Sequence, residues 1–121
     1  MKILSVTQLL DLFGSVRFRF NSEVDLQNGI ELVLKRAEAS FQRELALCSK
    51  DRPDFVVDGG IAIEVKIQGT FAQAARQIDR YAKHDNITSI ILIGSPAWIT
   101  RLPAAIGGKP VYAIRLTESL L

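Results

Sequence analysis

Hydrophobic and polar residues along the chain follow patterns that predict alternating helices and strands. Apolar residues at helical spacing, together with capping residues, predict helices at residues 3–13, 22–38 and 70–85. Alternating or compact β-branched runs predict strands at residues 40–47, 54–57, 61–67, 88–93 and 111–116. A loop or short helix around Trp98 separates the last two strands. From residue 22 onward the order is helix, three strands, helix, strand, short helix and strand, which predicts an α/β fold.

Residues 54–67 predict a tight β-hairpin, and its register decides which side chains meet. A two-residue turn would pair Phe55 with Glu64, whereas a three-residue loop at residues 58–60 pairs Asp54 with Glu64. The second register is favoured because it also pairs Phe55 with Ile63, aligns the apolar residues of both strands on one face, and supplies glycine for the left-handed loop position. We therefore expect the carboxylates of Asp54 and Glu64 to lie directly opposite each other.

Two opposed carboxylates require compensating charge. Like charges about 4 Å apart repel by ~4 kcal/mol at an effective dielectric constant of about 20. Lys66, which alternation places on the same face as Glu64, supplies one positive charge for two negative ones. Mg²⁺ or Mn²⁺, which prefer oxygen ligands, would complete the balance. The alternative is a solvated polar face with an ordinary Lys–Glu surface pair.

A third acid could join this pair from either of two segments. Glu23 lies at the head of the apolar stripe of the helix predicted at residues 22–38, although a glutamate there also stabilises the positive N-terminus of a helix. Glu44 lies in the strand predicted at residues 40–47. The pattern of residues leaves both open.

The helix predicted at residues 70–85 carries polar and basic side chains beside its apolar face. Gln77 and Tyr81 lie one turn apart on one border of that face. The other flank and the outer surface carry three basic residues, which could contact backbone phosphates or form an ordinary solvated helix surface. These basic residues are Arg76, Arg80 and Lys83.

Composition indicates a single globular domain. The 121 residues are 48% hydrophobic and 23% charged, so we expect one domain with a core at about residues 22–116 and an N-terminal extension at residues 1–21. Residues 16–20 alternate apolar residues with two arginines, which is compatible with a strand, an interface edge or a basic contact. A net charge of +2 and a pI near 8.9 permit a nucleic-acid partner without requiring one.

Single residues and the N-terminal segment suggest the compartment. Cys48 is the only cysteine, which excludes an internal disulfide and a zinc cluster of cysteines, and we expect it to be a buried structural thiol in a reducing compartment. His84, the only histidine, is expected to be structural because it lies near a helix end, where a cation favours the helix dipole. No run approaches the roughly 20 apolar residues that span a bilayer, and the first residues are too polar for a secretory signal. We therefore expect a soluble cytoplasmic protein with no membrane partner.

The two acids and the lysine, set on the second and third strands, resemble the motif of the PD-(D/E)xK nuclease superfamily. Pro53-Asp54 matches the first half of that motif and Glu64-Val65-Lys66 matches the second half. The resemblance covers about residues 22–94. It implies a restriction-endonuclease-like fold, in which an αβββαβ core has a central mixed sheet flanked by helices.

Both helices of this core add to the resemblance. Glu23 is similar in placement to a helix glutamate of archaeal Holliday-junction resolvases, which favours it over Glu44 as the third acid. Gln77 and Tyr81 resemble the Q-x-x-x-Y motif of RecB-type and viral exonucleases. The stretch at residues 52–78 also resembles small phage-encoded nucleases, which would act in the host-cell cytoplasm.

The activity that the resemblance implies is metal-dependent hydrolysis of DNA phosphodiester bonds. One or two Mg²⁺ ions, for which Mn²⁺ can substitute, would be held by Asp54, Glu64, the Val65 carbonyl and Glu23. Lys66 would orient the attacking water or stabilise the charge of the transition state. Gln77 and Tyr81 would position the substrate phosphate or the active-site lysine.

The sequence does not decide which form of DNA is the substrate or whether the protein is a homodimer. A chain of this size has little room for a base-reading domain, so we expect recognition of DNA structure, such as a branch, flap or end. A homodimer with two active sites would suit a Holliday-junction resolvase. Two alternatives are a non-catalytic nucleic-acid-binding module of the same fold and an adaptor or assembly protein without a nucleic-acid role.

Overall fold

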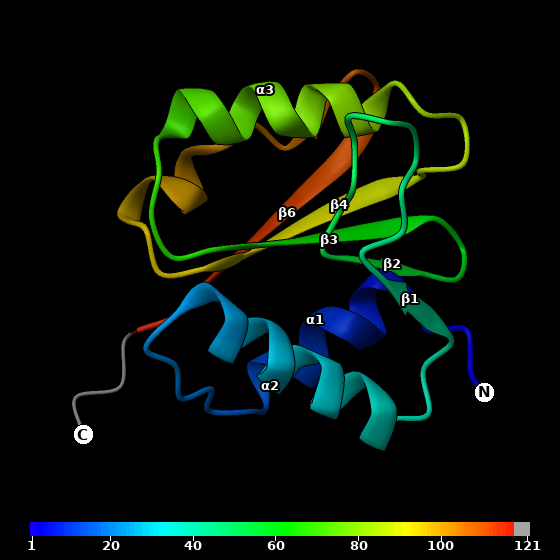
Figure 1. The fold of residues 1–121 in the computed structure, drawn as a ribbon, viewed down its shortest axis with the longest axis vertical. Coiled ribbons are helices and arrows are strands. Elements are labelled where there is room, and N and C mark those ends of the chain that lie inside the picture. The colour runs from blue at the N-terminus through cyan, green and yellow to red at the C-terminus, as the bar shows by residue number, and fades with distance from the viewer. Residues whose placement is uncertain (118–121) are drawn as a thin grey trace.

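The computed structural model describes residues 1–117 and shows an α/β protein. Within this range, three α-helices, a short 3-10 helix and six strands follow in the order α1 (Val6–Gly14), α2 (Glu23–Arg36), β1 (Phe41–Arg43), β2 (Phe55–Val57), β3 (Ile61–Lys66), α3 (Phe71–Ala82), β4 (Ser89–Gly94), η1 (Ala97–Arg101), β5 (Ala105–Ile106) and β6 (Lys109–Arg115). The strands form one open mixed sheet in the order β1-β2-β3-β4-β6-β5 (Figure 1). The predicted α/β class and mixed sheet are confirmed. Residues 118–121 of the predicted domain lie outside the described residues.

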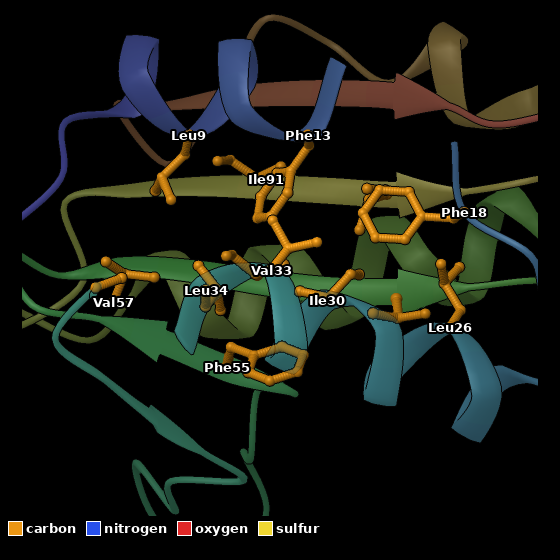
Figure 2. Close-up of a cluster of buried hydrophobic side chains, with 14 of the residues drawn as sticks. Leu9, Phe13, Phe18, Leu26, Ile30, Val33, Leu34, Phe55, Val57 and Ile91 are labelled. Carbon is orange, nitrogen blue, oxygen red and sulfur yellow. The ribbon is translucent and has the colours of Figure 1, made fainter. Parts of the chain in front are cut away.

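Helices α1 and α2 cover one face of the sheet (Figure 1). Leu9 and Phe13 of α1 and Leu26, Ile30 and Leu34 of α2 are buried there in one hydrophobic cluster. Figure 2 shows these side chains gathered against the sheet. The segment predicted as an N-terminal extension therefore contributes to the core.

Helix α3 covers the opposite face of the sheet (Figure 1). Its buried residues are Ala74, Ile78, Tyr81 and Ala82. The Thr70 hydroxyl accepts a hydrogen bond from the Gln73 N–H, 3.2 Å away, and the Gln73 side chain accepts from the Thr70 N–H, so a capping box fixes where α3 begins. Phe71, the first residue of α3, is 39% exposed and packs edge-on against Trp98, with the ring centroids 6.5 Å apart. None of the helices in residues 1–117 is long and apolar enough to cross a membrane.

The hairpin of β2 and β3 has the three-residue loop that the sequence predicts. Phe55 pairs with Ile63 and Val57 pairs with Ile61, in antiparallel register. Gly59 and Gly60 both have positive φ, 103° and 87°, which glycine adopts without steric cost. On the other side of β3, β4 and then β6 continue the sheet in parallel. The loop register therefore sets which side chains of β2 and β3 face α3.

The strand predicted at residues 40–47 is shorter than expected. It ends after Arg43 because Glu44 adopts the left-handed backbone conformation, with φ of 55°, which turns the chain out of the sheet. Phe41 packs on the side of α1 and α2, whereas Leu45 and Leu47 pack on the side of α3. The predicted strand therefore stops about halfway, and the chain crosses from one side of the sheet to the other at Glu44.

Two other segments differ from their predictions. Residues 16–20 form no strand. Their side chains do alternate, since Phe18 and Phe20 are buried and the two arginines are exposed. The short edge strand β5 was not predicted, and it pairs with β6 through a turn at Gly107 and Gly108, both with positive φ. A two-residue strand has too few positions to show alternation.

Candidate active site

The hairpin brings Asp54 and Glu64 together where β2 begins. Asp54 immediately precedes β2, and its backbone N–H donates a hydrogen bond of 3.3 Å to Glu64 Oε1. The Val65 N–H donates to Asp54 Oδ2 at 2.7 Å. Because the N–H and C=O of a strand residue point to the same side, the Val65 carbonyl also faces the Asp54 side of β3. The predicted opposition of the two acids is therefore confirmed.

Glu64 is held by partners on both of its carboxylate oxygens. The Tyr81 hydroxyl donates to Oε1 at 3.0 Å, and Gln77 Nε2 donates to the Tyr81 oxygen at 2.9 Å. Lys66 Nζ lies 3.2 Å from Oε2. The Glu64 residue is 3% exposed, so these contacts are made largely out of water. Helix α3 thus fixes the orientation of the carboxylate that β3 supplies.

The pair carries an electrostatic cost that its neighbours only partly offset. Burial first, and then the charge of Asp54, raise the pKa of Glu64 to about 7, while Lys66 lowers it. Burial raises the pKa of Asp54 to about 6, and the charge of Glu23 adds to this, against the Val65 N–H and Lys66. Near neutral pH the pair therefore retains a proton for part of the time when no cation balances its charge. The pair is a place where an added cation would be stabilised.

Both candidates for the third acid lie close enough to act on Asp54. The charges of Glu23 and Glu44 each raise the pKa of Asp54, and Glu23 has the larger effect. Glu23 is the first residue of α2 and is half-buried, whereas Glu44 is exposed. Electrostatics therefore ranks Glu23 above Glu44 as a neighbour of the pair.

One residue of the site was not predicted. Gln27 Nε2 donates a hydrogen bond of 3.0 Å to Asp54 Oδ1, and Arg43 donates to Gln27 Oε1 at 3.1 Å. Gln27 is four residues after Glu23 and therefore on the same side of α2. That spacing could have identified Gln27, but only if the sequence had also shown that α2 lies near the start of β2.

A groove runs from Lys66 along the first turns of α3. It has a volume of about 370 Å³ and is lined by Lys66, Gln68, Gly69, Thr70, Gln73, Ala74, Arg76, Gln77 and Arg80. These residues include three cations and no acid. The groove is therefore suited to an anionic chain that approaches Glu64 over Lys66.

The three basic residues predicted to contact phosphates are not equivalent. Arg76 and Arg80 line the groove. Arg80 is also paired with Asp51, with its Nε 3.0 Å from Oδ1. Lys83 does not line the groove, and its Nζ lies 3.3 Å from Asp79 on the solvated side of α3.

The hydroxyl of Tyr81 should have a measurable effect on Glu64. Burial and the Glu64 charge hold the pKa of the Tyr81 phenol above its ordinary value, so the hydroxyl remains a donor, and its hydrogen bond lowers the pKa of Glu64. We expect Tyr81→Phe to raise the pKa of Glu64 by about one unit. An NMR titration of the Glu64 carboxyl in metal-free protein measures this. Tyr112→Phe, on β6, is the matched control and should leave that pKa unchanged; a Tyr81→Phe titration that matches the unsubstituted protein contradicts the assignment.

Comparisons with known proteins give no family assignment. No protein-family model, curated protein or solved structure matches the chain. The functional argument therefore rests on the geometry of the site.

Proposed function

We propose that the protein is a divalent-metal-dependent nuclease that hydrolyses DNA phosphodiester bonds. The observation that carries the proposal is the buried Asp54–Glu64 pair, with both pKa values raised and Lys66 beside it, at the end of a cationic groove. Such a pair is costly in a purely structural role, because burial and mutual repulsion both oppose its ionisation. Strongly perturbed carboxylates beside a cleft are typical of active sites.

The topology supports a restriction-endonuclease-like fold for this nuclease. Helix α2, the antiparallel strands β1, β2 and β3, helix α3 and the parallel strand β4 follow in the αβββαβ order, with helices on both faces. The acids lie on the hairpin in the centre of that order. This order of elements supports the fold that the sequence resemblance implies.

The donor set fits a hard divalent cation. Mg²⁺, for which Mn²⁺ can substitute, prefers oxygen ligands, and the groups that would hold it are Asp54, Glu64, the Val65 carbonyl and Glu23. When bound, the ion would neutralise charge on the scissile phosphate and lower the pKa of a water molecule. The raised pKa values of Asp54 and Glu64 support this fit, because a bound cation would take the place of the retained proton.

The protein's own side chains have separate tasks in this proposal. Lys66 donates hydrogen bonds towards the charge that develops on the phosphate or towards the attacking water, and it costs little reorganisation because Glu64 already holds it. Tyr81 and Gln77 are positioning residues, since Tyr81 donates a hydrogen bond to Glu64 and Gln77 donates one to Tyr81. Arg76 and Arg80 bind backbone phosphates along the groove.

We propose that the enzyme recognises DNA structure rather than a long base sequence. Cations and small or amide side chains line the groove, and these suit contacts to backbone phosphates. A junction, flap or end would be recognised by its shape. A homodimer with two such sites would act as a Holliday-junction resolvase.

A panel of DNA substrates tests the proposed activity. Linear, circular, single-stranded and branched DNA are incubated with the protein in Mg²⁺ or Mn²⁺. We expect cleavage of at least one form. We expect EDTA and Asp54→Asn to abolish it and Lys66→Ala to leave only a small residual rate. Cleavage that survives all three treatments would show that another activity is responsible. The substrate that is cut fastest identifies the preferred DNA shape.

DNA binding at several salt concentrations separates the alternative functions. Each phosphate that the protein neutralises should make log K fall with log salt by about 0.9. A non-catalytic binding module would show this slope without any cleavage, and an assembly protein would show no salt-dependent DNA affinity.

A further inference from the structure

A second group of metal-binding side chain types lies outside the candidate active site. Cys48 Sγ is 3.5 Å from Asp51 Oδ2, and His84 Nε2 is 2.8 Å from the same oxygen. The three atoms all lie within 4.8 Å of one another. They come from two separate segments, since Cys48 and Asp51 precede β2 whereas His84 follows α3. A thiol, a carboxylate and an imidazole therefore converge from the two segments that flank the active site.

The local backbone holds this group in place. The Leu47 N–H donates to the Asp51 carbonyl at 2.8 Å, which closes the turn that carries Cys48 and Asp51. His84 lies two residues after the end of α3, and its N–H donates to the Tyr81 carbonyl at 3.1 Å. Cys48 is exposed, contrary to the expectation of a buried thiol, because this turn lies on the surface. The group is thus accessible to an ion from solvent.

We propose that Cys48, Asp51 and His84 form a Zn²⁺ site whose fourth ligand is water. Thiolate, imidazole and carboxylate are the side-chain ligands that Zn²⁺ takes in proteins. In a tetrahedral site, bond lengths of about 2.0–2.3 Å place neighbouring ligand atoms roughly 3.3–3.6 Å apart. The separation of Cys48 Sγ and Asp51 Oδ2 is already in this range. His84 Nε2 needs to move away from Asp51 by about half an ångström, and its separation from Cys48 Sγ, which is within 4.8 Å, has to reach the same range. In such a site Cys48 would coordinate as the thiolate and His84 through the lone pair of Nε2.

Arg80 supports the proposed site from outside. Its Nε lies 3.0 Å from Asp51 Oδ1, so the carboxylate presents its other oxygen, Oδ2, to Cys48 and His84. Hydrogen bonds of this kind orient carboxylate ligands in metal sites. Asp51 is 6% exposed, so these contacts hold its carboxylate largely out of water. Lys109 Nζ donates to the His84 backbone carbonyl and leaves the ring free.

A bound ion would link the segment that carries Cys48 and Asp51, before β2, to the end of α3. Asp51 is three residues before Asp54, and His84 is three residues after Tyr81, so a bound ion would link the two segments that meet at Glu64. The two proposed sites should select different ions. Thiolate and imidazole favour Zn²⁺ at this site, whereas carboxylate and carbonyl oxygens suit Mg²⁺ at the Asp54–Glu64 pair.

A cysteine nucleophile explains the geometry less well. In a nucleophilic triad, the histidine lies between the cysteine and the acid, because it must take the thiol proton. Here Asp51 lies between Cys48 and His84 and contacts both. The arrangement suits three ligands that share one ion.

Spectroscopy with Co²⁺ as a probe tests the proposal. The experiment uses the full chain with Asp54→Asn, so that the active-site acids do not contribute a second strong site. We expect one Co²⁺ to bind with a thiolate-to-cobalt charge-transfer absorption, and we expect Zn²⁺ to displace it. Cys48→Ser should remove this absorption, and both Cys48→Ser and His84→Gln should weaken Zn²⁺ binding by more than about tenfold. Asp79→Asn, an acid on α3 outside the group, should change neither.

The outcomes are distinguishable from loss of folding and from loss of nuclease activity. Cys48 is exposed, so Cys48→Ser should keep the far-ultraviolet circular dichroism spectrum of the parent. Zn²⁺ should raise the unfolding temperature of the parent and leave that of Cys48→Ser unchanged. Absence of thiolate absorption in the folded parent, or its persistence in Cys48→Ser, would overturn the site. Neither readout depends on DNA cleavage.

Discussion

Replacing Lys66 with alanine should lower the single-turnover rate of DNA cleavage by about 10²–10³-fold. The Lys66 ammonium is fixed 3.2 Å from Glu64 at the end of the cationic groove, where it can donate to charge that develops in the transition state. Arg76 and Arg80 remain to bind the DNA backbone, so the dissociation constant should change much less than the rate. Single-turnover cleavage and equilibrium binding, measured on the same DNA, separate the two effects.

Lys83→Ala is the matched control for this experiment. Lys83 is 73% exposed, does not line the groove and, within residues 1–117, forms an ion pair only with Asp79 on the surface of α3. Its removal should leave the cleavage rate within a factor of about two, because an exposed ion pair contributes little. Equal losses of rate in Lys66→Ala and Lys83→Ala would show that general charge, rather than the position of Lys66, matters.

The free energy of unfolding of metal-free protein should fall as pH rises from about 4 to about 7. Both carboxyls of the Asp54–Glu64 pair have folded-state pKa values above their ordinary ones, so the folded protein binds more protons than the unfolded chain in this window. The stabilisation is complete below the ordinary pKa values and is lost as pH passes the folded ones. For Glu64, a change from 4.5 to about 7 corresponds to at most about 3 kcal/mol.

Glu64→Gln tests this pH dependence directly. The amide cannot ionise, so in EDTA at pH 8 the variant should be more stable than the parent, and its stability should depend less on pH between 4 and 7. Addition of Mg²⁺ should stabilise the parent and not the variant, because only the parent keeps both carboxylates for the ion. Urea unfolding at several pH values measures both effects. A free energy of unfolding that rises from pH 4 to pH 7 in EDTA for the parent, but not for Glu64→Gln, would contradict the raised pKa values.

Local patterns were sufficient to predict the hairpin and its acids. The turn at residues 58–60 and the alternation of β3 fix the register, and register alone places Asp54 beside Glu64. The spacing of Gln77 and Tyr81 on α3 is likewise local; Tyr81 bonds to Glu64, and Gln77 bonds to Tyr81. These features were predictable because each depends on residues close together in the sequence.

Features that depend on packing between distant elements were not predictable. Gln27 contacts Asp54 only because α2 packs near the start of β2, and no local sequence pattern predicts that packing. Glu44 has a positive φ without being glycine, so nothing in the sequence indicated where β1 ends. The meeting of Cys48 with His84 depends on how the surface turn packs against the end of α3.

The central claim is that Asp54 and Glu64 support metal-dependent hydrolysis of DNA by water. Its most direct test is single-turnover cleavage of the preferred DNA in isotopically labelled water, with and without Mg²⁺, for the parent and for Asp54→Asn purified identically. We expect Mg²⁺-dependent product from the parent, with one labelled oxygen in the phosphate at the new end, and no product from Asp54→Asn. Equal cleavage by both proteins, or no cleavage of any DNA form by the parent in Mg²⁺ or Mn²⁺, would contradict it.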